Sequence, residues 1–267
     1  MKIYISADIE GVAGIASWDE TDPGKPDYTR YRDQMTAEVL AACEGAIAAG
    51  AKEIMVKDAH GPARNIDPAQ FPECVSFSRG WSGHPFVMMD ELDDSYASAL
   101  MIGYHSRAGS GGSPMAHTMS SSVIGLFRIN GAPASEFTIN AMTAQYVGVP
   151  VVFVSGDELL SRDIEVYNEH IATVVTQRGH GNSTVSIHPG LARKRIAEEV
   201  KKSLKRDLEV CRRPLPDHFQ VEIEYKDATK AYRASFYPGA KLVEHRIVSF
   251  ETDDYFDVLR LINTITF

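Results

Sequence analysis

The chain of 267 residues contains few cysteines and no motif that would use them. Cys43, Cys74 and Cys211 are far apart and odd in number, and no Cys-x-x-Cys pair occurs. Neither a thiolate zinc site nor a disulfide framework is therefore indicated. We expect inert thiols in a reducing compartment.

Basic residues are also scarce relative to acidic ones. The chain has 27 Lys and Arg against 36 Asp and Glu, a formal net charge of −9 with neutral histidines. Sequence-independent nucleic-acid binding needs a basic surface, so we expect no nucleic-acid partner. Metal cations and small substrates are compatible with this charge.

Long hydrophobic runs are missing as well. The longest apolar stretch, residues 147–154, is interrupted by Gly148 and Pro150. It is far shorter than the ~18 residues that suggest a membrane span. The N-terminus passes directly into a strand-like pattern and does not resemble a signal peptide. We therefore expect a cytoplasmic protein with no membrane partner.

Alternating strand and helix patterns predict an α/β fold with a mostly parallel sheet and flanking helices. A strand at 2–7 precedes a helix that Asp27 begins and Gly50 ends, and a second strand follows at 53–56. Strand, helix and strand with short joints form the βαβ unit of a parallel sheet. Further strands are expected at 97–103, 149–155 and 171–176, and further helices at 135–146, 157–168 and 189–208.

The segment from Arg212 to Pro216 is typical of a joint between two parts of a chain, because it contains two prolines in five residues. Beyond it, we expect strands at 219–223 and 246–250 and helices near 227–236 and from 253 onward. The sequence thus predicts a metal-bearing catalytic α/β domain over residues 1–211 and a smaller C-terminal α+β portion over 212–267.

Two carboxylates follow the first strand. Asp8 and Glu10 share one side of the chain if the backbone stays extended, with Cα atoms about 6.6 Å apart at ~3.3 Å per residue. Carboxylates held this close repel each other unless a cation or a proton lies between them. The alternative is a pair of solvated acids at the end of a strand.

Histidines follow two more of the predicted strands. His60 ends the sequence Val-Lys-Asp-Ala-His after the second strand, and His105 directly follows the apolar run of residues 99–104. Ligands of parallel sheets gather at the carboxyl ends of the strands, so Asp8, Glu10, His60 and His105 are expected at one edge. A single histidine at the end of a strand is more often a structural residue than a metal ligand. Here, however, three strands end in Asp and Glu, in His and in His, and this favours a common site.

Glu136 and His117 are weaker candidates. Glu136 begins a predicted helix, where a carboxylate is also stabilised by the helix dipole. His117 follows a glycine- and serine-rich loop, where a histidine is either surface decoration or a group that reaches a substrate. The position of His117 alone favours surface decoration, whereas for Glu136 a helix cap and a site residue both stay open.

Taken in order, these motifs resemble the D-aminopeptidases of the DppA type, peptidase family M55. The resemblance rests on Asp8-Ile9-Glu10-Gly11, Asp58-Ala59-His60, the segment from Gly103 to Ala108, His117 and Glu136. It is specific from residue 1 to about residue 160 and fainter beyond.

The resemblance implies a centre of two zinc ions bound by Asp8, Glu10, His60, His105 and Glu136, with Asp8 bridging the ions and His117 as the catalytic histidine. It implies a zinc-dependent aminopeptidase that hydrolyses short peptides with N-terminal D-amino acids. It also implies a homo-oligomer, a decamer of two rings whose active sites face an inner chamber.

The chemistry of the residues agrees with this expectation. Mixed imidazole and carboxylate ligation suits zinc, manganese or cobalt better than magnesium or calcium. Two metals of this kind activate water near neutral pH. Metal-bridging carboxylates serve phosphoryl chemistry equally well, so a two-metal phosphoesterase is one alternative. A non-catalytic protein that binds metal or peptide is another.

Overall fold

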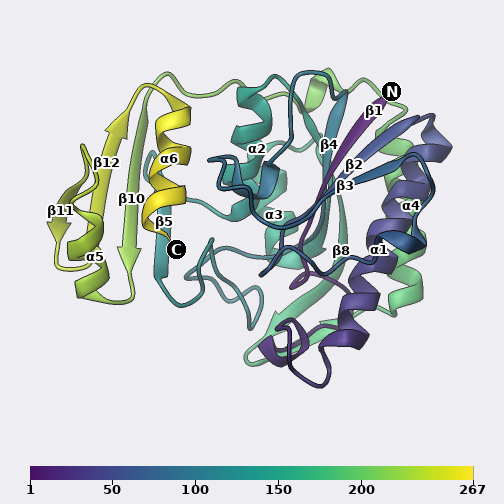
Figure 1. Ribbon diagram of the computed structural model, residues 1–267, viewed down its shortest axis with the longest axis horizontal. Helices are drawn as coiled ribbons and strands as arrows, with labels where there is room; N and C mark the ends of the chain where they lie inside the picture. Colours follow the sequence, from purple (N-terminus) through teal and green to yellow (C-terminus); the bar gives the residue numbers. More distant parts are fainter. Residues whose placement is uncertain (267) are drawn as a thin grey trace.

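The computed structural model describes residues 1–266 and contains a seven-stranded sheet as its larger layer (Figure 1). All neighbouring strands in this sheet are parallel except the last pair, β8 and β9. In spatial order the strands are β3 (Val75–Ser78), β2 (Glu53–Asp58), β1 (Lys2–Ala7), β4 (Ser98–Tyr104), β7 (Val151–Asp157), β8 (Ala172–His180) and β9 (Ser183–Ser186).

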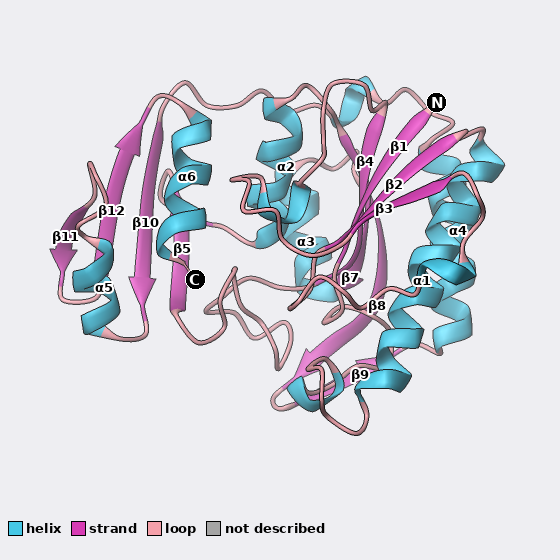
Figure 2. Ribbon diagram, viewed as in Figure 1, coloured by secondary structure: helices cyan, strands magenta, loops and turns pink. Residues whose placement is uncertain are grey.

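Helices cover both faces of the seven-stranded sheet. On one face lie α1 (Tyr28–Ala49) and α4 (Pro189–Ser203), which pack against each other. On the other face lie α2 (Glu136–Tyr146) and α3 (Glu158–Tyr167), as Figure 2 shows. β1 and β4 are buried along almost their whole length. Strands covered on both faces read as continuous apolar runs, which explains why the sequence revealed them.

A second sheet of five antiparallel strands forms the smaller part of the molecule. Its order is β11 (Lys241–Glu244), β12 (Ile247–Thr252), β10 (Phe219–Tyr225), β5 (Ile124–Ile129) and β6 (Ala132–Pro133). Two helices, α5 (Ala228–Ala234) and α6 (Tyr255–Ile265), accompany it. The sheet thus combines strands from residues 124–133 with strands from the end of the chain, while the domain boundary at 211/212 stays a prediction.

Helix α6 links the two parts of the molecule, because it lies between the smaller sheet and α2 (Figure 1). The Tyr255 hydroxyl donates a hydrogen bond of 2.6 Å to the Ile139 carbonyl in α2. Further along α6, the Asn263 amide donates to the Gly83 carbonyl at 3.1 Å. Gly83 belongs to a loop before the short 3-10 helix η3 (Val87–Met89), and this loop borders the site described below.

The predicted fold class, a mostly parallel α/β sheet with flanking helices and a smaller α+β portion, is confirmed. α1 ends at the left-handed Gly50 as expected. The fourth helix ends at Ser203, before the predicted Leu208. The strands β3, β5, β6, β9 and β11 were not predicted; they are short or half-exposed, so their apolar pattern is weak.

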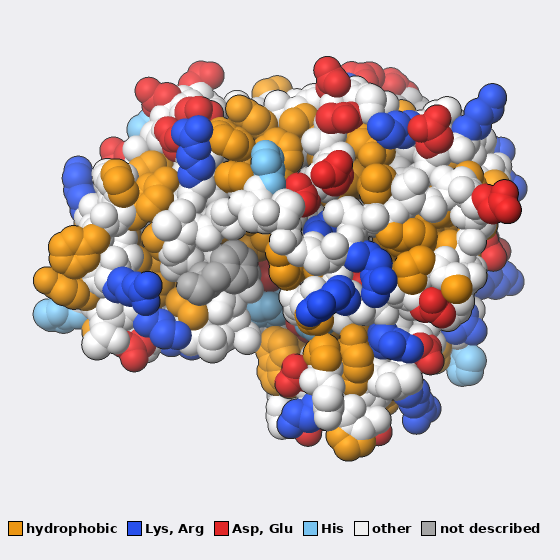
Figure 3. Space-filling view, in the orientation of Figure 1, with side chains coloured by type: hydrophobic (Ala, Val, Ile, Leu, Met, Phe, Trp, Pro, Cys, Tyr) orange, Lys and Arg blue, Asp and Glu red, His pale blue; other side chains and the backbone are white. Residues whose placement is uncertain are grey.

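The charge distribution on the surface and the character of the helices also bear on the expected partners. Acidic and basic side chains are interspersed over the face drawn in Figure 3. Within residues 1–266, no helix combines the length and the apolar character needed to cross a membrane.

Glu38 connects α1 to the loop that follows β1. Its side chain is fully buried, and its Oε1 accepts hydrogen bonds from the Ala13 N–H at 3.0 Å and from Gln34 at 3.5 Å. Burial raises the pKa of Glu38 from 4.5 to about 7, although Ala13, Gln34 and the charge of Arg193 oppose this shift. The folded chain therefore favours the neutral form of this carboxyl group.

This shift predicts a pH-dependent contribution to stability. Between pH 4.5 and pH 7 the folded chain holds a proton on Glu38 that the unfolded chain releases, so the free energy of unfolding falls as pH rises. At 1.36 kcal/mol per pKa unit the decrease from this group is about 3 kcal/mol. The substitution Glu38→Gln removes the decrease, so relative to the wild type the variant gains stability as pH rises.

Urea unfolding of both proteins at several pH values measures this difference. Glu44→Gln, on the exposed side of the same helix, is the matched control. A difference between Glu38→Gln and the wild type that does not change with pH would contradict the prediction.

Candidate metal centre

The carboxyl ends of three neighbouring strands bring the predicted side chains together. β1 lies between β2 and β4 and is followed by Asp8 and Glu10, while His60 follows β2 and His105 follows β4. The expected convergence is confirmed: ligand atoms of Asp8, Glu10 and His60 lie within 4.8 Å of one another. The same holds for Asp8, His105 and Glu136, and for Glu10, His105 and His117.

Two glycines allow this close approach of the strand ends. A Cβ on Gly11 would overlap the Tyr104 carbonyl, and a Cβ on Gly103 would overlap the Asp8 carbonyl. Gly103 also has a φ of +72°, a conformation that side chains disfavour. The Gly11 N–H donates to the Gly103 carbonyl at 2.8 Å, which fixes the loop of Asp8 and Glu10 against the strand of His105.

Each imidazole is oriented by a backbone carbonyl. His60 Nε2 lies 3.1 Å from the Thr21 carbonyl, His105 Nδ1 lies 2.9 Å from the Ser106 carbonyl, and His117 Nδ1 lies 2.9 Å from the Met115 carbonyl. A carbonyl oxygen can only accept a hydrogen bond, so in each neutral ring the nitrogen beside the carbonyl carries the proton. In the neutral ring the opposite nitrogen carries the lone pair that a metal ion would use, and this nitrogen faces the carboxylates.

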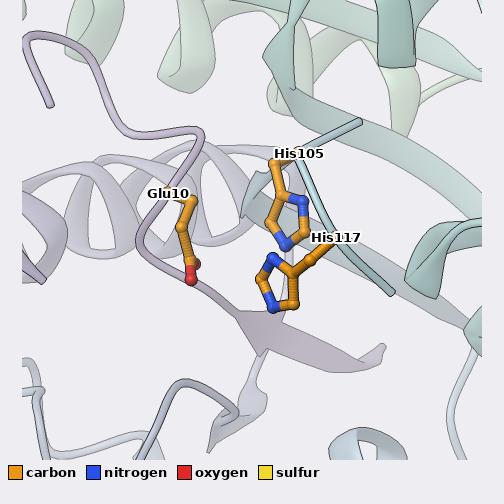
Figure 4. Close-up of side chains that lie close together, drawn as sticks. All are labelled: Glu10, His105 and His117. Carbon is orange, nitrogen blue, oxygen red and sulfur yellow. The ribbon is translucent and has the colours of Figure 1, made fainter. Parts of the chain in front are cut away.

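The free ring nitrogens lie close to the carboxylates. His60 Nδ1 is 3.1 Å from Glu10 Oε2 and 3.2 Å from Asp8 Oδ1. His105 Nε2 is 3.4 Å from both Asp8 Oδ2 and Glu136 Oε2, and His117 Nε2 is 3.4 Å from Glu136 Oε1. Figure 4 shows the rings of His105 and His117 side by side, opposite Glu10; they stack with centroids 4.2 Å apart.

Glu136 faces the site at the first turn of α2. The cap of this helix is Ser135, whose side chain accepts a hydrogen bond from the Thr138 N–H. The Met119 N–H donates to Glu136 Oε1 at 2.8 Å, and Met119 has a φ of +62° that is rare for a residue with a side chain. The Glu136 carboxylate is therefore held toward Asp8 and His105, and the capping function belongs to Ser135.

The charges of these buried groups act strongly on one another. Burial and the neighbouring Glu10 raise the pKa of Asp8 well above its usual range. Burial would raise the pKa of Glu10 too, but His60 holds it well below the usual value. In Glu136 burial is likewise outweighed, here by His105 and His117, which lower its pKa.

The pKa values of the three histidines are also shifted in different directions. Burial opposes the charged form of His60 and His105, yet the carboxylates around each ring raise both pKa values well above the ordinary one. Burial and the charge of His105 lower the pKa of His117 instead. His117 is thus the imidazole of the site that stays neutral most readily.

The donor set fits divalent metal ions. Glu10 Oε2 and His105 Nε2 are buried and receive no hydrogen bond in the described chain. Unpaired buried polar atoms are expensive, and a cation between them satisfies both the lone pairs and the repulsion among three carboxylates. Mixed nitrogen and oxygen ligands suit zinc, manganese or cobalt.

Several supporting residues were not predicted from the sequence. The carbonyls of Thr21, Ser106 and Met115 leave no side-chain signal, because any residue supplies a carbonyl. Asp58, two residues before His60, accepts hydrogen bonds from Asn65 and the Ile66 N–H. It therefore shapes the loop, and Asn65 in turn donates to the His60 carbonyl.

A cavity of about 560 Å³ opens beside the cluster. Asp8, Glu10, His60, His117 and Glu136 all line it. Its volume lies within the range of about 300–1,000 Å³ that is typical of small-molecule sites. A molecule the size of a short peptide can therefore reach the carboxylates and imidazoles.

Comparisons with known proteins agree on one family. A family model described as D-aminopeptidase, peptidase M55, matches residues 1–264. A D-aminopeptidase of Bacillus subtilis (strain 168) is 30% identical over 271 residues, which cover 100% of this chain and 97% of that protein. A solved structure described as the Zn-dependent D-aminopeptidase DppA from Bacillus subtilis, a self-compartmentalizing protease, aligns with a TM-score of 0.92 and 28% identity. The alignment covers 100% of this chain and 97% of that one.

Proposed function

Since this chain belongs to peptidase family M55, the D-aminopeptidases, we propose that it is a zinc-dependent aminopeptidase that hydrolyses short peptides with N-terminal D-amino acids. One observation carries the proposal: three carboxylates and three imidazoles are gathered in one cluster, and all of them except His105 line a cavity large enough for a short peptide. The described relatives are a D-aminopeptidase and a Zn-dependent D-aminopeptidase.

Five residues are proposed as ligands of two zinc ions: Asp8, Glu10, His60, His105 and Glu136. Asp8 is proposed to bridge the ions, because its carboxylate belongs both to the set with Glu10 and His60 and to the set with His105 and Glu136. Manganese and cobalt suit the same donors. When bound, such ions polarise the scissile carbonyl and lower the pKa of water, which supplies a nucleophile at neutral pH.

His117 is proposed as the catalytic histidine. Its Nδ1–H donates to the Met115 carbonyl, so Nε2 carries the free lone pair and lies 3.4 Å from Glu136 Oε1. Its lowered pKa keeps the ring neutral near pH 7. Nε2 can therefore take a proton from the attacking water and pass it to the leaving amine, as general acid–base catalysis requires.

We propose that the protein acts as a homo-oligomer, a decamer of two rings. The support is the description of the similar Bacillus subtilis enzyme as a self-compartmentalizing protease, since compartments require several subunits. Sedimentation velocity is expected to give a species about ten times the monomer mass. A monomer would contradict the assembly but leave the proposed metal site intact.

The peptidase activity is expected to depend on metal. After dialysis against a chelator the protein should lose hydrolysis of D-Ala-D-Ala, and zinc, manganese or cobalt should restore it, because the proposed nucleophile requires a bound ion. Ninhydrin detection of released D-alanine measures this. Unchanged activity in metal-free protein would contradict the proposal, as would turnover of p-nitrophenyl phosphate without turnover of any peptide.

Replacement of His117 separates catalysis from metal binding. His117→Ala should keep two zinc ions per chain, measured by plasma mass spectrometry, while kcat falls by roughly 10²- to 10⁴-fold, the range for loss of an acid–base group. His84→Ala is the control, because His84 lines the same cavity but belongs to none of the ligand sets. A loss of zinc in His117→Ala would identify His117 as a ligand.

A further inference from the structure

Both tryptophans of the chain line the same cavity. The sequence contains two, Trp18 and Trp81, and each borders the space beside Asp8 and Glu10. Their exposed fractions are 40% and 43%, which is high for such large apolar side chains. Exposed aromatic rings at a concave site typically bind a ligand.

Trp81 is held in place by a backbone carbonyl and by a buried lysine. Its Nε1–H donates to the Gly61 carbonyl at 2.8 Å, and Gly61 directly follows His60. The Lys57 ammonium lies 4.6 Å from the centre of the indole ring. Lys57 is fully buried and donates to the Gly80 carbonyl. A cation over one face of an indole attracts the ring, so the exposed part of Trp81 lies away from Lys57 and is held at a fixed position.

Trp18 is held beside His117. It begins the short 3-10 helix η1 (Trp18–Glu20), and its ring meets His117 edge-on with centroids 5.3 Å apart. Glu20 stabilises this segment by accepting hydrogen bonds from the Ala16 and Ser17 N–H groups. Thr21, the next residue, supplies the carbonyl that orients His60. Both indoles are therefore tied to segments that hold histidines of the proposed reaction centre.

The remaining cavity wall is apolar or neutral away from the ligand cluster. Val87, Met88 and Met119 contribute flexible or branched apolar side chains, and Ser120 and Asn263 contribute neutral polar ones. Among the described residues that line the cavity, none is a lysine or an arginine. Methionine side chains adapt to ligands of different shape. Such a wall favours a bulky apolar group and offers no counter-charge to an acidic side chain.

We propose that Trp81 and Trp18 are specificity-determining residues that hold a bulky apolar or aromatic side chain of the peptide beside the bond to be cleaved. This inference rests on the proposed peptidase function. It narrows the substrate class to short D-peptides with such a side chain on one of the two residues that flank the scissile bond. Lys57 is a positioning residue that acts through Trp81.

The proposal is tested by comparing the kcat/KM values of three dipeptides on the zinc-loaded protein. At least one of D-Phe-D-Ala and D-Ala-D-Phe should exceed D-Ala-D-Ala in kcat/KM by about 10-fold or more, the typical discrimination of an apolar pocket. Trp81→Ala should reduce this ratio several-fold, mainly through KM, whereas Trp81→Phe should retain most of it. Tyr232→Ala is the control, because Tyr232 is an aromatic residue 60% exposed that does not line the cavity.

Intrinsic fluorescence gives a second readout that does not need turnover, since both tryptophans border the cavity. D-Phenylalanine should change the emission at concentrations about 10-fold lower than D-alanine, and Trp81→Phe should lose the part of the change that Trp81 reports while Trp18 still reports binding. Equal kcat/KM values for the three dipeptides and equal fluorescence titrations would overturn the specificity proposal while peptidase activity stands. Selective binding of D-phenylalanine without cleavage of any peptide would instead contradict the proposed function.

Discussion

The repulsion among three buried carboxylates is the constraint on which the centre of this molecule depends. Asp8, Glu10 and Glu136 are almost completely buried, and carboxylate oxygens of Asp8 lie within 4.8 Å of one in Glu10 and of one in Glu136. Imidazoles between them offset part of this repulsion, yet Glu10 Oε2 and His105 Nε2 still receive no hydrogen bond in the described chain. A fold that preserves such an arrangement is built to hold cations rather than to maximise its own stability.

The surrounding architecture holds these charges in place through the backbone. Gly11 and Gly103 let two strand ends approach to hydrogen-bonding distance, and three carbonyls fix the tautomers and orientations of the histidines. Because the restraints come from main-chain groups on several loops, the site is preorganised before any ligand arrives. Helix α6 extends this organisation to the cavity wall, since Asn263 holds the loop that carries Trp81. The smaller sheet thus contributes to the site through α6.

The central strands of the larger sheet and the polar residues that follow them, Asp8, Glu10, His60 and His105, could be predicted from the sequence, whereas Glu136 became a proposed ligand only through the family resemblance. Buried parallel strands such as β1 and β4 are continuous apolar runs, and polar residues at their ends stand out. The strand β5, one of the two main partners of β10, was not visible in the same way, because it is only half-buried and lies far from β10 in the chain. The carbonyls that orient the histidine rings could not be predicted from the sequence either, because every residue, like Thr21, has a main-chain carbonyl. The proximity of Trp18 and Trp81 depends on tertiary structure and leaves no local pattern.

Crystallographic anomalous scattering at the zinc absorption edge reports the number, identity and ligands of bound ions together. For zinc-loaded protein we expect two peaks, one near Asp8, Glu10 and His60 and one near Asp8, His105 and Glu136, with oxygen and nitrogen ligands at about 2.0–2.2 Å. An empty cluster, or zinc bound elsewhere on the chain, would contradict the proposed metal site.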